Sequence, residues 1–110
     1  TTRNRILGVH NLPDAQIVFL DTPGIHRPHD RLGRSMVRAA VTAMTEVDLC
    51  LFVVEPRRPG PGDLEIVESL VRAGRPTFLV PNKIDRVPAD AVLPVVDAYR
   101  GRMDFEEVFP

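Results

Sequence analysis

Short apolar runs alternate along the chain with longer segments in which apolar residues recur at helical spacing. The runs predict strands over 5–10, 16–21, 49–54, 77–80 and 108–109, and the periodic segments predict helices over 31–44, 63–72 and 91–102. Strands that alternate with helices favour an α/β fold with a mostly parallel sheet and right-handed crossovers. Ligands are then expected beyond the carboxyl ends of the strands.

Several local signals refine this pattern. Leu12–Ala15 is a plausible turn between two antiparallel strands, which makes 5–21 a hairpin. The segment 49–54 is apolar at every position, so we expect that strand to be buried on both faces. Asp63 is a candidate helix cap, Gly74 a candidate residue just past a helix end, and Pro94 is tolerable only in a first turn.

The composition indicates one ordinary globular unit. The 110 residues are 44% apolar and 26% charged, which excludes collagen-like, low-complexity and disulfide-scaffold compositions, and the net charge of −1 gives no sign of a polyanion-binding tail. The single cysteine, Cys50, has no disulfide partner and favours a reducing, cytoplasmic setting. Because there is no stretch of 18 consecutive apolar residues and no basic-then-apolar leader, we expect neither a membrane span nor a secretory signal.

The strand that ends near residue 20 delivers a carboxylate into a glycine-containing loop, Asp21-Thr22-Pro23-Gly24. Asp21 can offer a hard oxygen to the hydration shell of Mg²⁺, and the backbone N–H of Gly24 can approach a terminal phosphate without a Cβ in the way. Such turns also occur without any nucleotide. This motif alone therefore leaves a simple turn as an alternative.

A second motif, Asn82-Lys83-Ile84-Asp85, follows the strand 77–80 at the same end of the predicted sheet. The carboxylate of Asp85 can accept hydrogen bonds from N1–H and the exocyclic amine of guanine, and Asn82 can meet the Hoogsteen edge of the base. Lys83 can lay its alkyl stem over the ring. The alternative is a solvated loop with an Asx turn, but the two motifs in this order favour a guanine-nucleotide site.

The start of the chain adds a third candidate, Thr1-Thr2-Arg3. A threonine hydroxyl can ligate Mg²⁺ while its backbone N–H holds the terminal phosphate, so that the loop is ordered only when that phosphate is present. Without the other two motifs, these threonines would be taken as strand-edge residues.

Taken together, these segments resemble the GTPase domain of the bacterial Era family, in the Era/TrmE-like branch of translation-factor-related GTPases. The likeness covers essentially the whole chain. It rests on Thr-Thr-Arg at 1–3, on Asp-Thr-Pro-Gly-Ile-His at 21–26, on Leu-Phe-Val-Val-Glu at 51–55 and on Asn-Lys-Ile-Asp at 82–85.

The resemblance implies a three-layer P-loop NTPase fold, mostly parallel with one antiparallel edge strand. It also implies a GTP-hydrolysing switch that acts in small ribosomal subunit assembly. By motif position it assigns Thr2, Asp21 and Gly24 to catalysis, Thr2 and Asp21 to Mg²⁺, and Asp21, Thr22, Pro23, Gly24, Asn82, Lys83 and Asp85 to GTP binding. The implied partners are GTP and GDP, small-subunit ribosomal RNA bound through a C-terminal KH domain, and the inner membrane as a peripheral contact of a cytoplasmic protein.

Two family motifs are missing from these residues. There is no Gly-x-x-x-x-Gly-Lys-[Ser/Thr] phosphate loop, and no Ser-Ala motif follows the last predicted strand. We therefore interpret residues 1–110 as a partial GTPase domain without its central phosphate-loop strand and without the KH domain. We expect the isolated segment neither to fold stably nor to hydrolyse GTP. The alternative is an interaction module that keeps the scaffold but works without nucleotide.

Ile25 stands where many GTPases carry the glutamine that orients the attacking water. Because a branched alkyl group cannot orient water, catalysis must draw on other groups, and the resemblance implies a hydrophobic substitute for the glutamine that is aided by K⁺, by backbone groups or by a partner. We predict slow intrinsic turnover in a single-turnover assay of the intact protein. Rapid hydrolysis without K⁺ and without a ribosomal partner would contradict this prediction.

Overall fold

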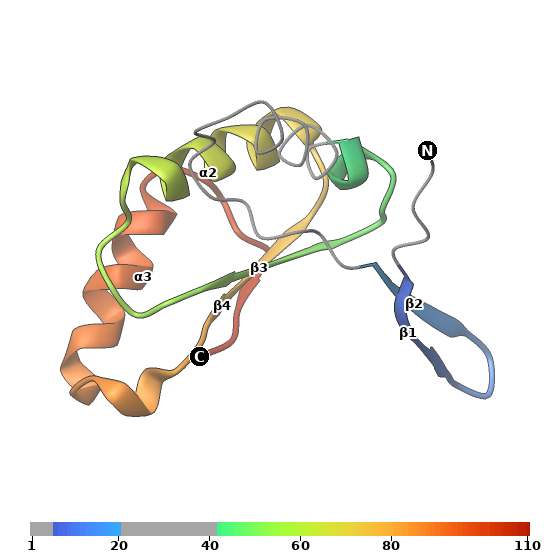
Figure 1. The fold of residues 1–110 in the computed structure, drawn as a ribbon, viewed down its shortest axis with the longest axis horizontal. Coiled ribbons are helices and arrows are strands. Elements are labelled where there is room, and N and C mark those ends of the chain that lie inside the picture. The colour runs from blue at the N-terminus through green and yellow to red at the C-terminus, as the bar shows by residue number, and fades with distance from the viewer. Residues whose placement is uncertain (1–5, 21–41) are drawn as a thin grey trace. The chain divides into compact units, whose positions relative to one another are not determined.

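A computed structural model describes residues 6–20 and 42–110 of the chain (Figure 1). The chain divides into two compact units between residues 40 and 41, and each unit is described by itself. The first contains a β-hairpin, and the second contains a parallel sheet with its helices.

The hairpin consists of β1 (Ile6–Asn11) and β2 (Gln16–Leu20), which pair antiparallel. Its turn is closed by two backbone hydrogen bonds between Leu12 and Ala15, of 2.8 and 3.4 Å. The side-chain amide of Gln16 donates to Asn11 Oδ1 at 2.7 Å across the strand ends. The predicted antiparallel hairpin is confirmed over these residues, and it forms a two-stranded sheet of its own.

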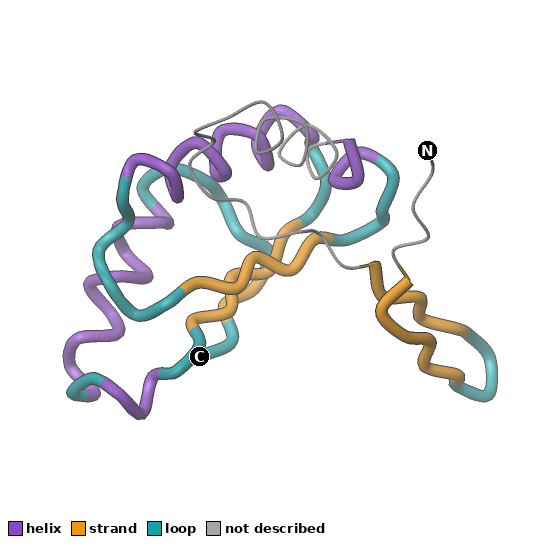
Figure 2. The backbone as a smooth tube through the Cα atoms, viewed as in Figure 1, coloured by secondary structure: helices purple, strands orange, loops and turns teal. Residues whose placement is uncertain are grey.

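The second unit has a three-stranded parallel sheet in the order β3 (Cys50–Val54), β4 (Thr77–Pro81) and β5 (Glu107–Val108). The helix α2 (Pro61–Ala73) connects β3 to β4, and α3 (Val92–Arg100) connects β4 to β5. Two 3₁₀ turns, η1 (Ile84–Arg86) and η2 (Ala89–Ala91), precede α3. Figure 2 shows this alternation, which confirms the α/β fold expected from the sequence.

Only the end of the helix predicted over 31–44 falls within the described residues, where 42–45 are helical. Asp21, at the end of the second predicted strand, also lies outside them. The helix predicted over 91–102 is confirmed as α3, which has Pro94 in its first turn and is one residue shorter at its start and two at its end. The final strand is confirmed one residue earlier than expected, at 107–108.

Both connecting helices lie on the same side of the three strands (Figure 1). This follows from the strand order, because two right-handed crossovers that move in the same direction place their helices on one face. The core forms beneath them from Met44, Phe52, Val54, Val67, Leu70, Leu79, Val95, Val96 and Tyr99. At its centre the rings of Phe52 and Tyr99 meet edge to face, with centroids 5.5 Å apart.

The expectation that 49–54 is buried on both faces is wrong. Phe52 and Val54 are buried, whereas Leu51 and Val53 are 53% and 56% exposed. Because α2 and α3 share one face, neither covers the side chains that alternate to the other face. A run of apolar residues thus looks the same in sequence whether one face or both are covered.

The helix predicted from Asp63 begins earlier, after Gly60, with Pro61 as its first residue. Proline suits that position because its φ is already helical and the N–H it lacks would have no partner there. Asp63 instead lies in the first turn, and its carboxylate accepts a hydrogen bond from the backbone N–H of Gly60 at 2.9 Å. The predicted end is confirmed, since Gly74 has φ +72° and donates to Leu70 O at 3.2 Å.

Gly62, near the start of α2, and Gly74, just past its end, allow the effect of an added methyl group to be compared between a helical and a left-handed backbone conformation. A Cβ would meet no heavy atom within 4 Å at either Gly62, in the first turn, or Gly74. We expect Gly62→Ala to stabilise the intact protein by about 0.5 kcal/mol, because it restricts the unfolded chain. Gly74→Ala should destabilise it by about 1 kcal/mol, because alanine is strained at positive φ. Urea unfolding of both variants measures these changes, and equal shifts would contradict the assignment of the helix end.

Tyr99 should make stability depend on pH at the alkaline end. Burial and, to a smaller extent, the charge of Asp63 raise its pKa from 10 to about 12, while Arg57 opposes the shift. Below pH 10 the phenol is protonated in both states, so it adds no pH dependence. Between pH 10 and 12 the unfolded state ionises first, and the free energy of unfolding should fall by up to about 1.4 kcal/mol per pH unit.

The matched variant for this prediction is Tyr99→Phe, which keeps the ring and removes the titrating group. The difference between the wild-type and variant unfolding free energies, followed from pH 9 to 12, isolates this residue from the other groups that titrate there. Two parallel curves would contradict the prediction.

Candidate functional site

The carboxyl ends of β3 and β4 lie side by side and carry the second predicted motif. The two strands pair in register from Cys50 with Thr77 to Val54 with Pro81. Beyond the last pair, the backbone N–H of Asn82 donates to Val54 O at 2.7 Å, which extends the ladder by one residue. The loop that follows β4 is therefore fixed to the end of β3 from its first residue.

The chain turns sharply at Lys83. This residue has φ +57° and ψ +34°, and it is the one non-glycine residue with positive φ among those described. The turn continues into η1, where Arg86 N–H donates to Lys83 O at 3.0 Å. A left-handed conformation costs a lysine about 1–2 kcal/mol, and such strain often marks ligand sites.

The turn gathers Asn82, Lys83 and Asp85 within four residues at the carboxyl end of β4, and all three are exposed. The structure thus places the three predicted guanine-binding residues together, on a short loop anchored to a buried strand. This is where an α/β fold presents its ligand-binding residues.

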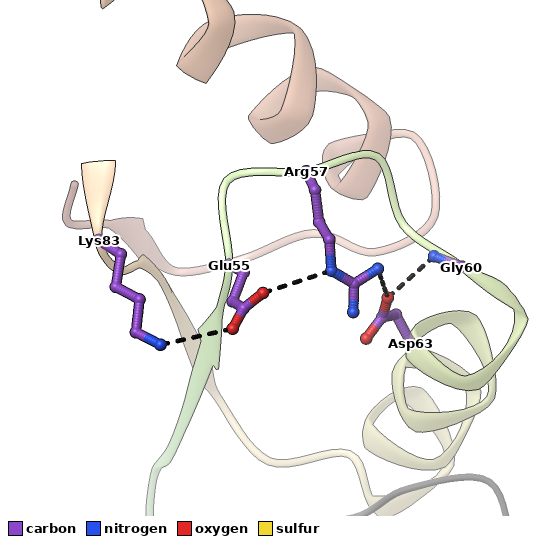
Figure 3. A network of polar contacts seen from close by, with 5 residues as sticks. All are labelled: Glu55, Arg57, Gly60, Asp63 and Lys83. Carbon is purple, nitrogen blue, oxygen red and sulfur yellow. Dashed lines mark hydrogen bonds and ion pairs between the residues drawn. The ribbon is translucent and has the colours of Figure 1, made fainter. Parts of the chain in front are cut away.

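Charged side chains connect this loop to the start of α2 (Figure 3). Lys83 Nζ lies 3.5 Å from Glu55 Oε1, and the other oxygen of Glu55 lies 3.5 Å from Arg57 Nε. Arg57 Nη1 is in turn 3.5 Å from Asp63 Oδ2, the same atom that accepts the hydrogen bond from Gly60. Positive and negative groups therefore alternate from the loop to the first turn of the helix.

The sequence did not single out Glu55 or Arg57 as site residues. Glu55 entered only as part of an apolar motif, and Arg57 as part of a loop rich in proline and glycine. One signal could have found Glu55: it directly follows a strand whose neighbour ends in the guanine motif, so the two loops must lie side by side.

The remaining predicted site residues, Thr2, Asp21, Thr22, Pro23 and Gly24, lie outside the described residues. Their assignment to Mg²⁺ and phosphate stays a sequence prediction. Within 6–20 and 42–110 no group of three or more histidine, cysteine or acidic side chains could hold a metal ion. In the same part of the chain, no helix has the length and apolarity to cross a membrane.

A family profile described as "50S ribosome-binding GTPase" matches residues 1–83 of the chain. The match covers the first predicted motif and the start of the second, together with the strand and loop that carry Glu55. The chain belongs to this family of GTPases.

Among the relatives, two proteins named GTPase Era match along the whole chain. One from Geobacter metallireducens is 51% identical over 111 residues, and one from Lacticaseibacillus paracasei is 46% identical over 111 residues. The chain spans 37% of the length of each. The resemblance to the Era family inferred from the motifs is confirmed.

A solved structure shows the same fold. The apo form of translation elongation factor SelB from Methanococcus maripaludis matches 99% of this chain and 24% of its own chain, with a TM-score of 0.71 and 20% identity. The predicted GTPase-domain fold class is confirmed by this likeness together with the family match.

Proposed function

We propose that this chain is part of a GTPase that binds GTP and GDP and hydrolyses GTP as a molecular switch. The observation that carries the proposal is the turn after β4, which presents Asn82, Lys83 and Asp85 at the carboxyl edge of the parallel sheet. Family membership supports the same activity.

The proposed site would distinguish guanine from adenine because adenine would leave polar groups of the site without hydrogen-bond partners. The ionised carboxylate of Asp85 accepts hydrogen bonds only, which matches N1–H and the exocyclic amine of guanine. Adenine offers an acceptor at N1 and no amine beside it, so the carboxylate would lose its partners, at a cost of about 1–3 kcal/mol for each buried unpaired group. Asn82 and the stem of Lys83 add contacts to the edge and face of the base.

The hydrolytic half of the proposal rests on residues assigned by motif. Thr2 and Asp21 would hold Mg²⁺, and a hydroxyl with a carboxylate is a donor pair that suits this hard cation. When bound, Mg²⁺ neutralises charge that develops on the phosphates. Gly24 would sense the terminal phosphate through its N–H. K⁺, backbone groups or a partner would take over the role of the water-orienting glutamine that Ile25 replaces.

The cellular part of the proposal is a role in small ribosomal subunit assembly and ribosomal RNA processing. It is supported by the resemblance to proteins named GTPase Era and includes RNA binding through a KH domain, a cytoplasmic location and peripheral contact with the inner membrane. Because the family profile carries the name of the 50S subunit, co-sedimentation of the intact protein with each purified subunit is the direct test. Binding to the large subunit alone would contradict this part.

We predict that Asp85→Asn changes which base the intact protein prefers. The amide would still accept from N1–H but would donate where guanine also donates, whereas xanthine has an oxygen there. Affinity for GDP should fall at least about tenfold, equivalent to about 1.4 kcal/mol, and affinity for XDP should rise. Calorimetric titration with GDP, XDP and ADP measures both changes.

The control for this prediction is Asp90→Asn, which makes the same change at an exposed position in η2, outside the motif. It should leave all three affinities unchanged. If Asp85→Asn also leaves the ratio of GDP to XDP affinity unchanged, the guanine assignment is wrong. Absence of any nucleotide binding by the intact wild-type protein would favour the nucleotide-independent module instead.

A further inference from the structure

We infer that Glu55 is a positioning residue for the guanine site, which acts by holding the ammonium group of Lys83. The inference rests on the proposed function and deepens it, because it assigns a role in nucleotide affinity to a residue outside the binding motif. Arg57 and Asp63 support Glu55 from the other side.

The first step in the argument is the arrangement of the two loops. Glu55 is the first residue after β3, and Lys83 is the second after β4. The hydrogen bond from Asn82 N–H to Val54 O joins the backbones one residue before each of these side chains. The ion pair between Lys83 and Glu55 thus bridges two loops whose separation is already fixed.

The second step concerns the lysine itself. Its side chain has four rotatable bonds and is 45% exposed, so without a partner for its ammonium the stem would sample many rotamers. Figure 3 shows the stem extended toward Glu55. A stem held at both ends, by the turn and by the ion pair, loses less conformational entropy when a base packs on it.

The third step is what holds Glu55, whose side chain is itself 56% exposed. Its second oxygen pairs with Arg57, and Arg57 also pairs with Asp63, whose side chain is only 24% exposed. Asp63 is fixed by the N–H of Gly60 in the first turn of α2. The network therefore runs from the ammonium end of a lysine to a half-buried carboxylate at a helix start.

This role predicts an effect on affinity but none on base selection. Exposed ion pairs are weak, so loss of the Glu55 charge should weaken GDP binding about two- to fivefold. The weaker binding should result from faster dissociation of GDP, because the association path is unchanged. The ratio of GDP to XDP affinity should stay constant, since Asp85 sets it.

The test is a double-mutant cycle in the intact protein, with Glu55→Gln and Lys83→Met made singly and together. Methionine keeps much of the apolar stem and removes the charge. We expect Glu55→Gln to raise the GDP dissociation rate about two- to fivefold when Lys83 is present and to have no effect on the rate in the Lys83→Met variant. The increase that Glu55→Gln causes when Lys83 is present should also be smaller at about 1 M salt, where the ion pair is screened.

Glu65→Gln is the matched control, because Glu65 is an exposed glutamate of α2 and no ion pair involves it in the described structure. It should leave the dissociation rate unchanged. Arg57→Gln is the second variant, and it should raise the rate less than Glu55→Gln does, again only when Lys83 is present.

The inference is overturned if Glu55→Gln is neutral when Lys83 is present, or if it raises the rate equally with and without that lysine, as a general structural defect would. These outcomes differ from failure of the proposed function, in which the wild-type protein would bind no guanine nucleotide at all. Unfolding curves of every variant show whether the folded state is kept, and Arg57→Gln decides the matter if Glu55→Gln does not fold.

Discussion

The in-register parallel pairing of β3 and β4 is the constraint on which the candidate site depends. The ladder runs from Cys50 with Thr77 to Val54 with Pro81, and the next backbone hydrogen bond already belongs to the loop. A shift of one residue would separate Glu55 from Lys83 and would move Leu79, which is fully buried, to the opposite face. The apolar packing that sets the register therefore also sets the distance between the charged groups.

The core and the site are linked a second time through α2. Asp63 caps the start of this helix through the N–H of Gly60 and also ends the charged network. Its charge is felt by Tyr99, which packs against Phe52 in the core. A carboxylate can accept hydrogen bonds from several donors at once. Asp63 can therefore stabilise the start of the helix through Gly60 and help to orient the exposed loop through Arg57.

Much of the fold could be predicted from the sequence because its signals are local. The turn at 12–15, the glycine that ends α2 and the proline in the first turn of α3 each act within a few residues. The exposed face of β3 could not be predicted, since it depends on the side to which both crossovers bring their helices. The start of α2 was misplaced because Asp63 satisfies a backbone N–H from inside the helix as well as it could from the cap position.

That Asn82, Lys83 and Asp85 lie together could be predicted, because they follow one strand within four residues, and their role in guanine binding stays a prediction. The supporting charges could not be predicted, because Glu55 meets Lys83 only through the pairing of strands, and Arg57 joins through Glu55. The left-handed turn at Lys83 has a consequence for how this position can vary. Asparagine or glycine would relax the backbone there but would remove the long side chain that reaches Glu55. A residue that relaxes the backbone at this position is therefore too short to pair with Glu55, and the long side chain that makes the pair keeps the backbone strained.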